Sequence, residues 1–258
     1  MLTSTTLFAD MARHVAGDRM RVESIVPAGA HVEEYEPRPD DARRVSQAQL
    51  FFVNGLDLDR WVEPLLRDKR ASAPVVTLTD GLPAIGDNPH LWFDVSLGRA
   101  YVGKIRDALV ALDPDGRATY LANAERYDGE LAALDVEVRA VIATIPPERR
   151  KLVTSHDAFP YFAKAYGLEI VGVTQTEPGK EPTPAELVRL VESVKAANVP
   201  AIFSEAGTSS RIVETVARET GVAKVVTDLP TDSVLDPPAD SYAGVIRTLA
   251  RKIADALG

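Results

Sequence analysis

Three of the four histidines in this 258-residue chain lie in polar segments that follow predicted strands. His31 and His90 lie in loops after two of these strands, and His156 directly follows a third. Carboxylates occupy comparable positions, because Glu33 comes two residues after His31 and Asp232 lies in the loop after a further strand. In an open α/β sheet, ligands bind beyond the carboxyl ends of the strands. Imidazole and carboxylate groups that meet there predict a site for a divalent cation.

Each of these residues also has a purely structural interpretation. His14, the fourth histidine, lies on a predicted helix, where a packing or surface role is expected. Ser155 could cap a helix that begins after His156, and Asp157 would then favour the helix dipole. Glu205 could serve the N-terminus of the next helix in the same way. The convergence of several such residues, rather than any one of them, supports the metal site.

Composition excludes several other kinds of chemistry. The chain has no cysteine, which excludes disulfides, thiolate metal sites, iron–sulfur clusters and cysteine nucleophiles. Its formal net charge is −9, whereas a nucleic-acid surface needs clustered positive charge, so we expect no nucleic-acid partner. No phosphate-binding loop, dinucleotide fingerprint, nucleophile elbow or zinc-protease motif is present. No apolar run approaches the roughly 20 residues that span a bilayer.

Short apolar runs alternate with amphipathic segments along the chain, which predicts an α/β fold with mostly parallel sheets. In the second half, strands are predicted at 151–155, 169–173, 201–204 and 224–227, and helices at 158–166, 184–197, 209–220 and 240–257. In the first half, strands are predicted at 21–26, 50–53 and 75–78, and helices at 6–16, 39–46, 58–67 and 96–112. The opening strand of this half is either missing or survives only as residues 2–4.

A long amphipathic helix is predicted between the two halves. Asp113 and Pro114 provide an N-cap and a proline at the first helical position, and Pro146-Pro147 ends the run. Apolar residues recur at alternating steps of four and three, namely Tyr120, Ala124, Tyr127, Leu131, Leu134, Val138, Val141 and Ile145. This period also fits a two-stranded coiled coil. We favour a single rigid helix that packs along both halves, since one apolar stripe is sufficient for that role.

The predicted organisation follows from these patterns. Residues 1–112 form an N-terminal α/β lobe, residues 113–147 form the connecting long helix, and residues 148–258 form a C-terminal α/β lobe. Each lobe has a mostly parallel sheet flanked by helices, and one long rigid backbone helix joins the two lobes.

Motifs along nearly the whole chain resemble those of one known family. They are Tyr35-Glu36-Pro37-Arg38-Pro39, Asn88-Pro89-His90-Leu91-Trp92, Val153-Thr154-Ser155-His156-Asp157, Ile202-Phe203-Ser204-Glu205 and Thr231-Asp232-Ser233. In this order they resemble the metal loops and strand ends of the metal-specific solute-binding proteins of bacterial ABC importers. Members of that family capture zinc, manganese or iron outside the cytoplasmic membrane. Several motifs in the right order are specific, so chance does not account for the match.

The resemblance implies two α/β lobes joined by one long backbone helix, with the metal between the lobes. Carried over residue by residue, His90, His156 and Asp232 match metal ligands. The family usually has histidine two residues before the tyrosine of its Tyr-Glu-Pro motif, and Glu33 occupies that position here. The implied metal shell is therefore Glu33, His90, His156 and Asp232. His31 could replace Glu33 only if the loop shifts.

The donor set bears on the identity of the metal. Glu205 matches a family position that is usually not a ligand, so it is left out of the shell. Within the family, three-histidine shells are zinc-like, whereas two histidines with two carboxylates resemble the manganese and iron members. The histidine-rich loop of zinc-specific members is also missing. We therefore expect one divalent ion, with manganese slightly ahead of zinc and iron as a third candidate.

The family resemblance predicts a carrier without catalytic turnover. Such a protein is the extracytoplasmic, monomeric substrate-binding component of an ABC importer and hands its ion to the membrane permease. It lies in the periplasm or on the outer face of the cytoplasmic membrane, although this sequence opens without a signal or lipoprotein segment. The alternative from another class is a mononuclear metallohydrolase in the same cleft, with Asp157 or Glu34 as base. A cell-adhesion surface protein is a third possibility, for which no feature of the sequence speaks.

Overall fold

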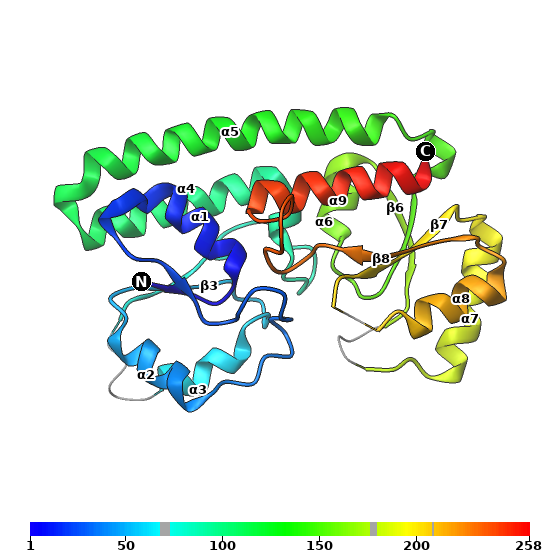
Figure 1. Ribbon diagram of the computed structural model, residues 1–258, viewed down its shortest axis with the longest axis horizontal. Coiled ribbons are helices and arrows are strands. Elements are labelled where there is room, and N and C mark those ends of the chain that lie inside the picture. The colour runs from blue at the N-terminus through cyan, green and yellow to red at the C-terminus, as the bar shows by residue number, and fades with distance from the viewer. Residues whose placement is uncertain (68–72, 176–179, 208) are drawn as a thin grey trace.

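The computed structural model describes residues 1–67, 73–175, 180–207 and 209–258. Two α/β halves lie side by side beneath one long helix, α5 (Arg117–Ala143), which extends over both of them (Figure 1). The C-terminal helix α9 (Tyr242–Leu257) lies between α5 and the second half and points its N-terminus towards the first half (Figure 1). The predicted fold class, two mostly parallel α/β lobes with a long helix between them, is confirmed.

The first half is built around a parallel sheet with the strand order β2-β1-β3-β4. Its strands and helices are β1 (Leu2–Thr3), α1 (Thr6–Ala16), β2 (Glu23–Ser24), α2 (Pro39–Gln47), β3 (Phe51–Val53), α3 (Glu63–Leu66), β4 (Val75–Thr77) and α4 (Val95–Leu112). The opening strand is therefore present and central, because Leu2 pairs with both Glu23 and Phe51. The alternative in which the opening strand of this half is missing is therefore wrong.

Two elements of the first half are shorter than predicted. The helix predicted at 58–67 is reduced to a 3₁₀ turn followed by α3. Asp59, at the start of that segment, accepts hydrogen bonds from the backbone N–H groups of Asn54 over 2.5 Å and Gly55 over 3.1 Å. These bonds fold the chain back onto the end of β3 before a regular helix can start. The strand predicted at 21–26 is limited to β2, where only two residues pair with β1.

The second half contains two pairs of parallel strands, β5-β6 and β7-β8, and β5 contacts β7. Its elements before α9 are β5 (Lys151–Thr154), α6 (Pro160–Tyr166), β6 (Glu169–Val173), α7 (Pro184–Ala197), β7 (Ala201–Glu205), α8 (Arg211–Thr220) and β8 (Lys224–Leu229). Gly167 and Gly221 end α6 and α8 in the left-handed region with φ of 75°, the conformation that favours glycine after a helix. These boundaries lie close to the predicted ones because the alternation of apolar and amphipathic segments is clear in this half.

The apolar stripe of α5 is covered by helices of the same chain. α5 packs against α1 and α4 of the first half and against α6 and α9. Val141 of the predicted stripe is partly buried and packs against the core, and its neighbour Ile142, which the prediction omitted, is only 1% exposed. A second chain in a coiled coil would need this stripe, which is already occupied. Within the described parts of the chain, no helix has the length and apolar character that crossing a membrane requires.

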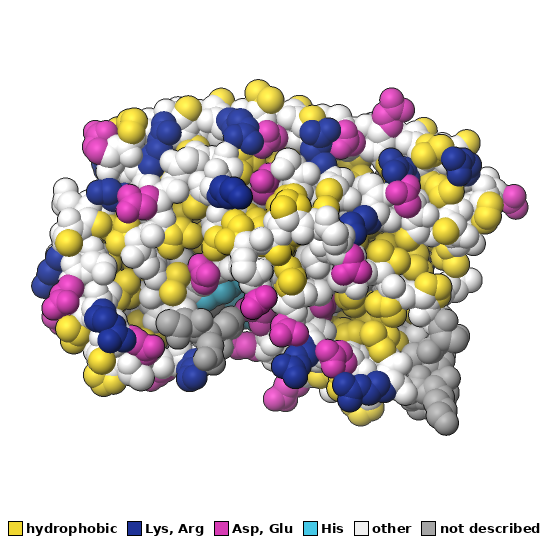
Figure 2. Space-filling model, turned by 180° about the vertical axis from the view of Figure 1, so that it is seen from behind, with side chains coloured by type: hydrophobic (Ala, Val, Ile, Leu, Met, Phe, Trp, Pro, Cys, Tyr) yellow, Lys and Arg dark blue, Asp and Glu magenta, His cyan; other side chains and the backbone are white. Residues whose placement is uncertain are grey.

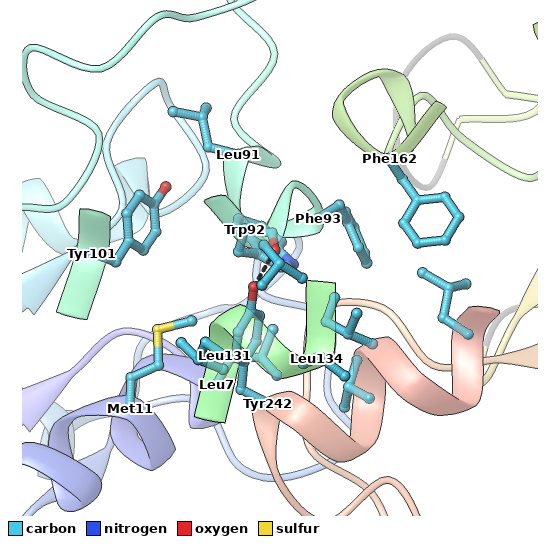
Figure 3. Packing of buried hydrophobic residues seen from close by; sticks show 14 of the residues in the cluster. Leu7, Met11, Leu91, Trp92, Phe93, Tyr101, Leu131, Leu134, Phe162 and Tyr242 are labelled. Atoms are coloured by element: carbon cyan, nitrogen blue, oxygen red, sulfur yellow. Dashed lines mark hydrogen bonds between the residues drawn. The ribbon is translucent and has the colours of Figure 1, made fainter. Parts of the chain in front are cut away.

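An aromatic core joins α9 to the first half. Tyr242, the first residue of α9, donates its hydroxyl hydrogen to the backbone carbonyl of Trp92 over 2.6 Å (Figure 3). Its backbone N–H donates to Asp10 Oδ2 on α1 over 2.9 Å. Gly98 makes room for the tyrosine, since a Cβ at this position would overlap the hydroxyl oxygen. This packing fixes the backbone two residues after His90, so it supports the loop that carries a candidate ligand.

Candidate metal centre

Four loops bring the four predicted ligands together. Glu33 comes from the loop after β2, His90 from the loop between β4 and α4, His156 from the end of β5, and Asp232 from the loop after β8. His90, His156 and Asp232 are buried, whereas Glu33 is partly exposed. In the view from behind, a histidine side chain lies at the bottom of a hollow around which acidic side chains gather (Figure 2).

The nitrogen and oxygen atoms that could bind a metal face one another at short distances. The two Nε2 atoms of His90 and His156 lie 3.3 Å apart. Glu33 places Oε1 3.7 Å from His90 Nε2 and Oε2 3.9 Å from His156 Nε2. Asp232 Oδ1 lies 3.9 Å from His90 Nε2 and has no hydrogen-bond partner among the described residues. Glu33, His90 and His156 therefore form one cluster of donor atoms, and Asp232 adjoins this cluster at His90. Two imidazoles and two carboxylates are a donor set that suits a divalent transition metal.

His90 is held in a neutral environment. Its backbone N–H donates to Asn88 Oδ1 over 3.1 Å, and the same oxygen lies 3.2 Å from His90 Nδ1. Trp92 and Phe93 pack around the ring. Burial, and after it the neighbouring His156, hold the pKa of His90 well below its usual range. The ring is therefore neutral, and with Nδ1 facing Asn88 its Nε2 lone pair points to the centre.

His156 is held by a carboxylate instead. Its Nδ1 lies 2.6 Å from Glu205 Oε1, and this carboxylate also accepts hydrogen bonds from the hydroxyls of Ser155 and Thr231. The interpretation of Glu205 as a helix N-terminal residue is wrong, because it is buried and α8 begins only at Arg211. The interpretation of Ser155 as a helix cap is also wrong, because α6 begins only at Pro160 and the hydroxyl of Ser155 donates to Glu205. Such a carboxylate fixes the orientation of the ring and increases its basicity.

The titratable side chains around His156 have raised pKa values. Burial acts to lower the pKa of His156, but the nearby Glu205, Asp232 and Glu33 outweigh it and raise the pKa to about 9. Burial, with further contributions from Glu205 and Glu33, raises the pKa of Asp232 to about 8. Burial also raises the pKa of Glu33. An incoming cation must therefore displace protons from His156 and Asp232 at neutral pH.

His31 lies on a different side of the cluster from Glu33. One set of donor atoms within 4.8 Å of one another comes from Glu33, His90 and His156, and a second such set comes from His31, Glu205 and Asp232. Glu33 is therefore grouped with both candidate histidine ligands, whereas His31 is grouped with Asp232, the fourth predicted ligand. In the sequence, Glu33 is distinguished from other carboxylates by its position two residues before the tyrosine of the Tyr-Glu-Pro motif.

Other candidate residues have structural surroundings. His14 stacks on Tyr127, with ring centroids 4.0 Å apart, as expected for a packing role. Asp157 and Glu34, the candidate bases of a hydrolase, are both exposed. The roles of Asn88 and Glu205 as partners of the two histidines were not predicted from the sequence. The only available signal was their position, since each lies in or beside a strand-end loop.

Comparisons with known proteins identify the family of this chain. Residues 1–256 match the family model described as zinc-uptake complex component A, periplasmic (ZnuA). The chain belongs to this family. It is 37% identical over 240 residues to the manganese-binding lipoprotein MntA of Halalkalibacterium halodurans, a match that covers 91% of this chain and 79% of that protein. The family resemblance that the motifs indicated is confirmed.

Solved structures of similar proteins share the whole fold. The manganese-bound periplasmic metal-binding protein of Candidatus Liberibacter asiaticus matches with a TM-score of 0.89 and 27% identity, covering 100% of this chain and 98% of that one. The periplasmic zinc-binding protein TroA of Treponema pallidum matches with a TM-score of 0.90 and 26% identity over the same shares. These relatives are named as binding proteins, and none of them is named as a hydrolase, so the metallohydrolase alternative gains no support.

Proposed function

We propose that this chain is the extracytoplasmic substrate-binding component of a bacterial ABC importer and that it carries one divalent transition-metal ion between its two lobes. The ligands in this proposal are Glu33, His90, His156 and Asp232. The observation that carries the proposal is the convergence of their donor atoms from four separate loops, with His90 Nε2 within 3.9 Å of a donor atom of each of the other three. Family membership supports the transport role.

The transported ion in this proposal is manganese, with zinc next and iron third. Two carboxylates are hard ligands and, if bidentate, raise the coordination number above the four that zinc prefers. The similarity to a manganese-binding lipoprotein supports this order. The Irving–Williams order nevertheless makes such a site bind zinc more tightly than manganese in vitro. We therefore expect zinc to bind well in the test tube even though manganese is the ion that is carried.

Delivery of the ion requires a membrane permease as partner. The proposal places the protein in the periplasm or on the outer face of the cytoplasmic membrane, as a monomer, where a permease can receive the ion. Relatives named as periplasmic proteins and lipoproteins support this location. A carrier can saturate its ion with protein ligands, whereas a hydrolase needs an open coordination position and a nearby base. Four protein donors around one ion therefore favour the carrier.

The same proposal assigns a mechanical role to the connecting segment. In it, residues 1–112 and 148–258 are the two lobes, and the segment 113–147 holds them as a rigid strut. The burial of the α5 stripe against helices of the same chain supports this role, since bending the helix would expose that stripe. The contacts of Tyr242 with Trp92 and Asp10 provide a second tie between α9 and the first half. Small tilts of the lobes, rather than wide closure, then accompany binding and release.

Metal analysis tests the proposed function directly. The protein is purified without chelator, its metal content is measured by mass spectrometry, and binding of Mn²⁺ and Zn²⁺ is then titrated calorimetrically. The expected result is one ion per chain in the wild type and loss of high-affinity binding in His90→Ala. His14→Ala, which removes a histidine outside the site, is the matched control. A wild-type protein that binds neither ion, or His90→Ala protein that binds as well as the wild type, would refute the proposal.

A further inference from the structure

A second group of potential metal ligands adjoins the proposed site. His31, Glu205 and Asp232 offer donor atoms that all lie within 4.8 Å of one another. His31 and Asp232 come from the loops after β2 and β8, and Glu205 is the last residue of β7. Asp232 also faces His90 Nε2 across 3.9 Å, so this residue lies between the two groups. A single carboxylate is therefore in a position to contact an ion on either side.

Two atoms of this second group lack partners. Among the residues that the structure describes, His31 Nε2 and Asp232 Oδ1 are buried and make no hydrogen bond. Asp232 as a whole is only 4% exposed. Buried polar atoms are nearly always paired with protein or with an ordered ligand, because an unpaired one loses its interaction with water without compensation. The unpaired nitrogen and oxygen are the donors that a cation requires.

A small cavity lies beside these atoms. Its volume is about 10 Å³, and its lining includes His31, Thr231, Asp232 and Ser233. This volume corresponds to about one water-sized sphere, which is enough for a single ion or water molecule. The cavity thus has the size of one cation, and two of the three residues of the second group, His31 and Asp232, line it.

The small cavity adjoins a much larger surface groove. The groove has a volume of about 530 Å³ and carries Asp228 and Asp236 on its lining. Gly29, Ala206 and Leu235 line both the groove and the small cavity. These three residues border both spaces, and two of them are among the smallest residue types. Lys252, also on the lining, pairs with Asp228 over 2.5 Å, whereas Asp236 makes no ion pair among the described residues and attracts cations.

The wall between the two spaces is held in a defined conformation. The backbone N–H of Gly29 donates to Ser233 Oγ over 2.8 Å, and Ser233 Oγ lies 2.9 Å from Thr6 Oγ1 on α1. Gly207, with φ of 84°, occupies the left-handed region beside His31, and a Cβ on it would come within 3.5 Å of His31 Nε2. A Cβ at this glycine would make ordinary van der Waals contact with the imidazole that borders the cavity, so the positive φ is what favours glycine here.

We propose that His31, Glu205 and Asp232 form a second cation subsite, which a divalent ion occupies while it passes between the surface groove and the main site. This inference rests on the proposed function and adds a route to it. Asp232 transfers the ion, because it is the one residue of this subsite that also belongs to the main site. His31 then governs how fast the ion enters and leaves, and Glu33 governs how tightly it is held.

The test separates rates from affinity. His31→Leu removes the donor and keeps a side chain of similar size, while Ala206→Leu narrows the shared wall without removing any donor. Association of Mn²⁺ and of Zn²⁺, and their release to excess chelator, are measured by stopped flow, and the equilibrium Kd by calorimetry. Both variants should slow association and release together by about tenfold, with the Kd changed by less than about twofold. Thr248→Leu, on the groove away from the small cavity, is the matched control and should behave as the wild type.

Two outcomes would overturn the subsite. A Kd weakened about tenfold or more in His31→Leu, with unchanged association, would make His31 a ligand of the bound ion. Wild-type rates in both His31→Leu and Ala206→Leu would show that the ion takes another route. Circular dichroism and thermal melting confirm that each variant is folded, and Ala206→Leu gives an independent result if His31→Leu does not fold. Failure of the proposed function is a separate outcome, since the wild-type protein would then bind neither ion at equilibrium.

Discussion

His90 and His156 present the same ring nitrogen to the same centre from opposite halves of the molecule, but they are supported differently. His90 is backed by the neutral amide of Asn88 and by aromatic rings, and its pKa is lowered by burial. His156 is buried too, but it is backed by the carboxylate of Glu205, which contributes to raising its pKa to about 9. One residue type thus serves as a neutral ligand on one side and as a protonated group on the other.

This contrast has a consequence for binding. An ion that arrives at neutral pH meets a ready ligand in His90, whereas on the other side it competes with the protons of His156 and Asp232. The first half therefore contributes a ligand that is already deprotonated, whereas the second half contributes ligands that release protons as the ion binds. The identity of the partner behind each ring, rather than the ring itself, produces the difference.

Removal of either ring is expected to have the largest effect. His90→Ala and His156→Ala each delete one of four donors, so each should weaken Mn²⁺ and Zn²⁺ binding by about 100-fold or more, which corresponds to about 2.7 kcal/mol. Asp232→Ala should do the same. Calorimetric titration measures the Kd, and circular dichroism checks the fold. Retention of wild-type affinity in either histidine variant would remove that ring from the proposed shell.

Changes behind the rings should have smaller and unequal effects. Glu205→Gln keeps the shape but removes the charge behind His156, so binding should weaken by about 10-fold, at the lower end of what outer partners of metal ligands contribute. Asn88→Ala removes a neutral partner of His90 and should weaken binding by only a few-fold, because neutral hydrogen bonds contribute less than charged ones. The measurement is again the Kd for Mn²⁺. Equal losses in the two variants would contradict the contrast between the two sides.

The protons of the second side should appear directly in calorimetry. Binding of Mn²⁺ at pH 7 is expected to release protons, because the pKa of His156 is about 9 and that of Asp232 about 8, whereas His90 has none to release. Titrations in buffers of different ionisation enthalpy give the number released. Affinity should fall further as the pH is lowered. Binding without proton release at pH 7 would contradict the assigned protonation states.

The same pKa shifts predict how the stability of metal-free protein varies with pH. The raised pKa of His156, about 9, means that its stabilisation is full below its ordinary value of 6.5 and is lost as the pH rises towards 9. The raised pKa of Asp232, about 8, acts in the same direction between 3.8 and 8. The melting temperature should therefore fall between pH 6.5 and 9, and Mn²⁺ should reverse the fall. The fall should be smaller in His156→Ala, and a melting temperature that rises over this range would contradict the prediction.

The smallest expected effect concerns the relation between the halves. Because α5 packs along helices of both halves, the radius of gyration should change by less than about 1–2 Å on binding Mn²⁺, against about 20 Å for a compact chain of this size. X-ray scattering of metal-free and metal-bound protein measures this change. A larger change would show that the two sides of the site separate widely and would contradict the rigid connection.

The sequence was sufficient to predict much of this molecule. Alternating apolar and amphipathic segments located the strands and helices of the second half, and motif order placed Glu33, His90, His156 and Asp232 at one site. The short opening strand β1 was harder to place, because two residues carry no periodicity and only pairing with β2 and β3 makes the strand central. The burial of Ile142 was not predicted, because the step from Val138 to the next fully buried residue is four residues and not three. The helices that pack against α5 determine this step.

The partners of the histidines could not be predicted from sequence. Glu205 is 49 residues from His156 along the chain, and its role appears only when the ends of β5 and β7 are brought together. Likewise, the protonation states depend on burial and on the distances between carboxylates, neither of which a linear pattern contains. The separation of His31 from Glu33, two residues away, depends on the path of a loop without regular structure. These features arise from tertiary packing and not from local preference.

A metal-bound crystal structure with anomalous diffraction data tests the central claim most directly. Crystals grown with Mn²⁺ should give one anomalous peak per chain between the lobes, bonded to Glu33, His90, His156 and Asp232, with nitrogen and oxygen ligands at about 2.0–2.3 Å. A peak coordinated by His31 with Glu33 turned away, or a peak outside this cluster, would contradict the proposed shell.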